Sequence, residues 1–161
     1  MSDLRTDKIL LIGIGNNGRS DDALGWKFVD EFSNQTDVFD IDYRYQLQIE
    51  DALLITEYKK VIFVDASHNQ YEEGFSFYPC VPARSEAFTT HKLEPETVLW
   101  LTKDLFNQIP EVYVMAISGI HWELHQGLSD TAQQNFDKAV SHFKEWVDST
   151  LLASMNHQKQ G

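Results

Sequence analysis

The stretch over residues 8–14 is an almost unbroken apolar run, and it leads directly into a glycine-rich turn at residues 13–18. Such a run is typical of a parallel strand that is covered by helices on both faces. The turn satisfies the G-x-G-x-x-G pattern of dinucleotide-binding folds, and a helical pattern follows it. The start of the chain therefore predicts an α/β domain built on a parallel sheet.

Two carboxylates, Asp21 and Asp22, stand directly after this turn. In a dinucleotide site, the helix N-terminus at this point binds the pyrophosphate through free N–H groups and its positive dipole end. Two nearby carboxylates would repel a pyrophosphate by on the order of a few kcal/mol at an effective dielectric constant near 20. The pair therefore favours a cation as the ligand at this position.

Strand and helix patterns alternate along the whole chain without a linker, a repeat or a low-complexity segment. The fourth strand pattern is expected to lie at an edge or to run antiparallel, because the chain turns sharply before it. The sequence predicts one domain over residues 1–161, a twisted, mostly parallel sheet of about five strands with helices on both faces. The expected strands cover residues 8–14, 38–45, 61–65, 75–81 and 112–117, and the expected helices begin near residues 20, 50, 95 and 129.

Acidic residues outnumber basic residues by 25 to 13, which gives a formal net charge of −12. This balance argues against nucleic acid and anionic membrane surfaces as partners. The N-terminus lacks the shape of a signal peptide and no apolar stretch is long enough to span a bilayer, so we expect a cytoplasmic protein. The single cysteine, Cys80, excludes an internal disulfide and is expected to be a small buried hydrophobic residue.

Three polar residues are expected to meet at one edge of the predicted sheet. Asp22 follows the first strand, Asp65 ends the third and His91 precedes the third helix. Ligands of such sheets bind outside the carboxyl ends of the strands, where the strand order reverses. Two carboxylates and an imidazole suit Zn²⁺, Ni²⁺ or a similar divalent ion and leave positions open for water or substrate. An Asp at a strand end and a His in a loop are also common without a metal, so the spacing alone leaves both interpretations open.

Five sequence blocks stand in order between residue 9 and about residue 143. The blocks are Gly13-Ile14-Gly15-Asn16 with Asp21-Asp22-x-x-Gly25, Val64-Asp65-Ala66, Thr90-His91-x-Leu93, Ser118-Gly119, and Gly127-Leu128-Ser129. In this order and spacing they resemble the hydrogenase maturation endopeptidases. The resemblance implies that Asp22, Asp65 and His91 are the metal-binding positions. Asp21 is either a neighbouring carboxylate or simply a first-turn charge.

The resemblance also implies an activity. A member of this family removes a short C-terminal peptide from the large-subunit precursor of a nickel–iron hydrogenase after nickel insertion. The divalent metal is then nickel supplied by the substrate, with no dinucleotide, and the three ligands recognise the precursor through its ion. The catalytic group that cleaves the bond is not assigned, since there is no G-x-S-x-G elbow. Ser118 beside Gly119 is expected to form a turn at a strand end.

The chain departs from the family after the second strand, where an Asp-Gly-Gly-Thr type of turn is usual. Residues 43–51 contain no glycine, so positive φ angles and close backbone approach are not available there. The stretch from Tyr43 to Gln48 is either a distinct specificity loop or a longer strand. Its change affects which precursor is recognised and whether cleavage is retained.

Two other functions remain open beside the endopeptidase. One is a nickel- or hydrogenase-binding assembly factor that has lost cleavage. The other is a dinucleotide-dependent enzyme with Asp40 or Asp42 on the ribose. Among the remaining histidines, His68 is expected in an exposed turn. His121 and His125 have helical spacing, but Gly119 and Gly127 favour a loop with surface histidines.

Overall fold

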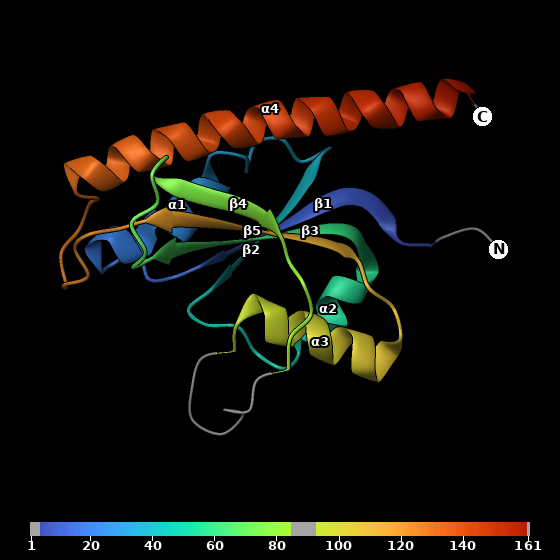
Figure 1. Ribbon diagram of the computed structural model, residues 1–161, viewed down its shortest axis with the longest axis horizontal. Helices are drawn as coiled ribbons and strands as arrows, with labels where there is room; N and C mark the ends of the chain where they lie inside the picture. Colours follow the sequence, from blue (N-terminus) through green and yellow to red (C-terminus); the bar gives the residue numbers. More distant parts are fainter. Residues whose placement is uncertain (1–3, 85–92, 161) are drawn as a thin grey trace.

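The computed structural model describes residues 4–84 and 93–160, and this part of the chain forms one α/β domain (Figure 1). Its five-stranded sheet has the order β2-β1-β3-β5-β4, in which β4 alone pairs antiparallel to its neighbour. The predicted fold class is therefore confirmed, including the antiparallel edge strand. The strands are β1 (Thr6–Ile14), β2 (Phe39–Arg44), β3 (Tyr58–Ser67), β4 (Phe75–Pro79) and β5 (Glu111–Ser118).

The helices cover both faces of the sheet. Two short 3₁₀ turns, η1 (Ser20–Ala23) and η2 (Ile55–Glu57), accompany four α-helices. Figure 1 shows the long α4 along one face and α2 with α3 on the other. None of the helices in the described residues is both long enough and apolar enough to cross a bilayer. The α-helices are α1 (Leu24–Asp30), α2 (Asp51–Leu54), α3 (Pro95–Phe106) and α4 (Asp130–Gln160).

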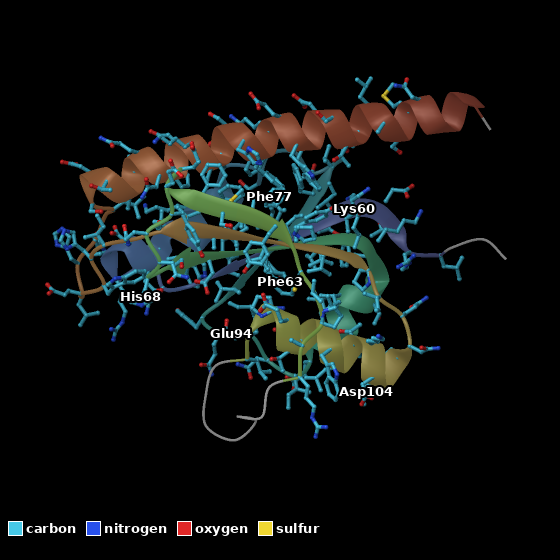
Figure 2. The ribbon with its side chains drawn as sticks, viewed as in Figure 1. Lys60, Phe63, His68, Phe77, Glu94 and Asp104 are labelled. Carbon is cyan, nitrogen blue, oxygen red and sulfur yellow. The ribbon has the colours of Figure 1, made fainter. Side chains whose placement is uncertain are left out.

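Strand alternation divides the core into two clusters. On one face, Phe28 of α1 and Phe143 of α4 pack with side chains of the central strands. On the other face, Phe63 of β3 packs with Val98 of α3 and with α2. Figure 2 shows Phe63 on the α3 side of the sheet and Phe77 on the α4 side. Because both faces are buried, the apolar runs of β1, β3 and β5 are nearly continuous, as the sequence predicts.

Two local expectations differ from the structure. β3 does not end at Asp65 but continues to Ser67, because its pairing with β5 runs on to Ser118. The first helix pattern begins as the 3₁₀ turn η1 and not as an α-helix. The Ser20 hydroxyl donates to the Glu123 carbonyl, 3.2 Å away, so this turn is bound to a distant loop.

The strand order reverses between β1 and β3, and α1 begins directly over this point. A Cβ atom on Gly25 would lie 2.4 Å from the carbonyl oxygen of Ile14 and 2.5 Å from that of Val64. Only glycine allows the helix to approach the ends of both strands this closely. The contact explains the glycine inside the helix and brings η1, with its two aspartates, to the carboxyl edge of the sheet.

Candidate functional site

Asp22 lies beside the carboxyl end of β1. Its carbonyl oxygen accepts a hydrogen bond of 3.0 Å from the backbone N–H of Asn16. Gly15 has a φ of 149°, and a Cβ atom on it would come within 2.0 Å of the same carbonyl oxygen. Gly15 is therefore required for the turn that folds Asp22 back against the end of the strand. The Asp22 residue is half-buried in this position.

Asp65 lies near the carboxyl end of the neighbouring strand, β3. It pairs in register with Ala116 of β5, and the preceding residue, Val64, pairs with Gly13 of β1. Val64 and Ala66 both pack on the α1 and α4 side of the sheet. Because successive side chains alternate, Asp65 is directed to the α2 and α3 side. The structure thus brings the β1 turn that carries Asp22 and the half-buried Asp65 to the same edge of the sheet.

The third predicted ligand, His91, lies outside the described residues. Leu93, two positions later, forms an isolated bridge with Leu47 and packs on the α2 and α3 side, the side to which Asp65 is directed. Within the part of the chain that is described, no group of three His, Cys, Asp or Glu residues is placed to hold a metal ion. The complete trio of Asp22, Asp65 and His91 therefore stays a prediction.

Most backbone N–H groups of the glycine-rich turn are bonded within the protein. The Gly15 N–H donates to the Arg44 carbonyl and the Gly18 N–H to the Asn16 side chain. The N–H groups of residues 16 and 19–22 also have protein acceptors. A pyrophosphate would need these donors. Asp40, moreover, lies inside β2 and accepts a hydrogen bond from Tyr58 rather than standing at the strand end. These contacts disfavour the dinucleotide hypothesis.

Asp21 is fully buried, and its carboxylate organises the loop over residues 119–129. Its oxygens accept hydrogen bonds from the backbone N–H groups of Ile120 and His121 at 2.7 and 2.9 Å. Ser129 donates two more, from its N–H and its hydroxyl, both at 2.8 Å. The Asp21 carboxylate is therefore directed into the protein and does not stand beside Asp22 as a second candidate metal ligand.

Two opposing effects act on the pKa of Asp21. Burial alone would raise it, because a carboxylate loses hydration. Hydrogen bonds from the backbone N–H groups of His121, Ile120 and Ser129, together with the Ser129 hydroxyl, stabilise the charged form and lower the pKa below 3.8. The carboxylate is therefore ionised at neutral pH and acts as a fixed acceptor for the loop.

The same loop is also tied to the turns after β1 and β3. The Ser20 N–H donates to the His125 carbonyl at 2.7 Å, which joins the loop to η1. On the other side, the exposed ring of His68 stacks on that of Trp122, with centroids 3.9 Å apart. Figure 2 places His68 at one end of the sheet. The loop over residues 119–129 therefore contacts the carboxyl edge of the sheet both at the turn that carries Asp22 and beyond the end of β3.

The remaining polar residues of this edge have structural partners. The Ser118 hydroxyl donates to the Asn69 carbonyl and accepts from the Tyr71 N–H, so its predicted role in a strand-end turn is confirmed. His121 and His125 lie in an irregular loop and are exposed, as the flanking glycines predict. None of these three residues offers an activated nucleophile.

The segment after β2 folds around a buried aspartate, Asp51, whose burial was not predicted from the sequence. Asp51 accepts hydrogen bonds from Arg44 Nε at 3.0 Å and from the Gln48 N–H at 2.8 Å. Trp26 of α1 donates its indole N–H to the Arg44 carbonyl at 3.0 Å. The strand ends at Arg44, so residues 45–50 form a loop rather than a longer strand. Charge pairing across seven residues could have suggested the Arg44 and Asp51 contact, but not its burial.

Cys80 is buried on the α2 and α3 side, as expected for a small hydrophobic residue. Burial, with a smaller contribution from the nearby Glu96 charge, raises the pKa of its thiol to about 12. A thiol that stays protonated is a poor nucleophile.

Comparison with known structures shows which proteins share this fold. No protein-family model matches the sequence, and no curated protein matches it. The nickel–iron hydrogenase maturation protease HycI from Thermococcus kodakarensis superimposes with a TM-score of 0.65 and 23% identity, over 86% of this chain and 91% of that one. The hydrogenase maturating endopeptidase HybD from E. coli superimposes with a TM-score of 0.67 and 20% identity, over 89% of this chain and 93% of that one.

A third structure, a hydrogenase 2 maturation peptidase from a Thaumarchaeota archaeon, has a TM-score of 0.61 and 22% identity, over 87% of this chain and 97% of that one. Each comparison covers most of both chains, so the likeness extends over the whole domain. At these identities the likeness concerns the fold. This chain therefore has the fold of the hydrogenase maturation proteases.

Proposed function

We propose that this protein is an endopeptidase that removes the C-terminal extension of a nickel–iron hydrogenase large-subunit precursor after nickel insertion. The observation that carries the proposal is the placement of Asp22 and Asp65 at one carboxyl edge, within the fold of the maturation proteases. His91 is the third residue of the proposed recognition set. The resemblance of its sequence block to the family, and the nearby Leu47 and Leu93 bridge, support its inclusion.

In this proposal the metal ion arrives with the substrate. Two carboxylate oxygens and one imidazole nitrogen suit Ni²⁺, and three ligands leave coordination positions that the precursor can retain. The formal charge of −12 further favours the approach of a cation. Sharing the ion holds the scissile bond beside the protein, and such positioning can lower a reaction barrier by several kcal/mol. A precursor without nickel would lack this anchor.

A processing assay tests the proposal. Nickel-loaded precursor is incubated with the protein, and the loss of the C-terminal peptide is read from the intact mass of the large subunit. Asp22→Ala, Asp65→Ala and His91→Ala should each abolish processing, because each removes one ligand. The Asp104→Ala variant, changed at an exposed position of α3, should cleave the precursor at the normal rate. Circular dichroism of each variant verifies that the fold is retained, and undiminished processing by His91→Ala would contradict the proposal.

A second candidate is an assembly factor that binds the nickel-loaded precursor without cutting it. The observation that favours it is the glycine-free loop over residues 45–50, which Asp51 and Arg44 hold in a fixed shape. A binding assay in the same mixture separates the two functions. An assembly factor would bind the precursor with an affinity that depends on Asp22 and Asp65. The mass of the large subunit would then stay constant.

A further inference from the structure

Three aromatic rings form a cluster on the outer edge of the sheet. The indole ring of Trp26 contacts Tyr43 and Tyr45, with centroid distances of 5.6 and 5.1 Å. Tyr43 lies in β2, two positions after Ile41, which packs on the α1 side, and Tyr45 is the first residue after the strand. Strand alternation places the Tyr43 side chain on the face that α1 borders, and the contact with Trp26 shows that the Tyr45 ring lies on the same face.

Two rings of this cluster, Trp26 and Tyr43, are held by hydrogen bonds although the cluster is open to solvent. Tyr45 is 69% exposed and Tyr43 is 41% exposed. The indole N–H of Trp26 is fixed on the Arg44 carbonyl, and the Tyr43 hydroxyl donates to the Asp30 carboxylate. Burial and the Asp30 charge raise the pKa of Tyr43 to about 12, so the phenol remains a donor. Exposed rings that are already oriented lose little conformational entropy on binding, a property of aromatic anchors at interfaces.

The Asp30 carboxylate beside the rings favours a cationic occupant. Asp30, an exposed residue, borders the rings through its bond to Tyr43. The guanidinium of Arg44, the nearest basic group along β2, is bound instead to Asp51 and, at 3.6 Å, to Asp42. The faces of Tyr and Trp rings attract cations. The aromatic faces and the Asp30 carboxylate thus offer two complementary contacts to one Arg or Lys side chain.

The cluster adjoins the candidate site through a single carbonyl group. The Arg44 carbonyl accepts the N–H of Gly15 as well as the indole N–H of Trp26. Gly15 is the residue that packs against the Asp22 backbone. A polypeptide held at Asp22 through its metal ion would therefore pass close to the rings.

We propose that Trp26, Tyr43 and Tyr45, together with Asp30, form a specificity surface for an Arg or Lys side chain in the polypeptide segment that this protein cleaves. That this segment belongs to a substrate rests on the proposed function. Binding of an Arg or Lys side chain to this surface does not depend on it. The surface lies where the family usually has a glycine-rich turn, so it would give this chain a preference of its own.

The binding part is tested with two short probes that differ only in charge, acetyl-Gly-Arg-Gly-amide and the same peptide with citrulline in place of arginine. The readout is the NMR shift of the Trp26 indole N–H in ¹⁵N-labelled protein, assigned with Trp26→Phe. The arginine peptide should bind about tenfold more tightly than the citrulline peptide. Tyr45→Leu and Asp30→Asn should each weaken arginine binding at least about threefold.

Matched controls are Phe106→Leu and Asp104→Asn on the exposed side of α3, which should leave the affinity unchanged. Equal affinity for the two peptides, or unaltered binding by Tyr45→Leu, would overturn the proposal. Shifts of the Trp26 signal that appear on raising the protein concentration alone would identify a second copy of the chain as the occupant and would also overturn it.

A second arm uses the precursor. Replacing the basic residues of its C-terminal segment with Gln, one at a time, should raise KM about tenfold at one position with little change in kcat. An unchanged KM for every substitution would overturn the proposal that the aromatic surface binds a basic residue of the C-terminal segment. If the native precursor is not cut at all, the proposed function fails, while the peptide assay still decides whether the cation surface exists.

Discussion

Replacing Asp21 with Ala should destabilise the protein strongly although the residue lies at the proposed site. The substitution removes the acceptor of four hydrogen bonds, three of them from backbone N–H groups of the loop over residues 119–129. Hydrogen bonds to a charged group contribute about 1.5–3 kcal/mol each, and water can replace some of them because the loop is partly exposed. We therefore expect a loss of about 3–5 kcal/mol in the free energy of unfolding.

Urea unfolding followed by circular dichroism measures this loss from the shift of the midpoint at constant slope. Asp104→Ala, at an exposed position of α3, should leave the midpoint unchanged. The midpoint of Asp21→Asn should lie between those of Asp21→Ala and Asp104→Ala, because the amide keeps one acceptor oxygen but loses the charge. A loss below about 1 kcal/mol for Asp21→Ala would refute the view that this carboxylate holds the loop.

The same carboxylate predicts a pH dependence. The pKa of Asp21 in the folded state is below 3.8, its ordinary value, so the folded state favours the ionised form. Its stabilisation is complete above the unfolded-state pKa and is lost as the pH falls through the lower, folded-state pKa. The difference in unfolding free energy between the native chain and Asp21→Asn should therefore be constant above about pH 5 and shrink below about pH 4. A difference that grew on acidification would contradict the assignment.

Three further substitutions or reactions test other parts of the structure. Gly25→Ala should lower the unfolding free energy by about 2–3 kcal/mol or more, because its Cβ atom would collide with carbonyl oxygens of β1 and β3, and an unchanged melting temperature would contradict this close contact. Asp51→Ala should cost about 3 kcal/mol in chemical unfolding, since it leaves Arg44 Nε and the Gln48 backbone N–H without their acceptor. A neutral result would show that water replaces the lost carboxylate. Cys80, with its pKa raised to about 12, should react with a thiol reagent at pH 8 only after unfolding, and fast labelling of the native protein would show that the thiol is accessible.

The sheet could be predicted from the sequence because its signal is local. Apolar runs such as residues 61–64, separated by turn residues, reflect burial on both faces, and the structure has these runs as the central strands. The position of Asp65 near the end of β3 also followed from the end of such a run. The two further strand residues after Asp65 could not be predicted, because the length of β3 depends on its pairing with β5.

The hydrogen-bond networks of the site could not be predicted, because their partners are far apart in the sequence. Asp21 binds groups about 100 residues away, and the neighbouring Asp22 has the same chemistry and an equally acidic context. Only the folded backbone distinguishes the inward carboxylate from the one at the edge. Trp26 and Tyr45 likewise come from different elements and meet only because α1 packs beside the end of β2.

The most direct test of the account compares one precursor in two states. The same hydrogenase large-subunit precursor, with and without nickel, is incubated with the native protein, and its intact mass is followed over time. We expect the nickel-loaded form to lose its C-terminal peptide and the nickel-free form to remain uncut. Cleavage of both forms at equal rates would contradict recognition through the substrate's ion at Asp22, Asp65 and His91.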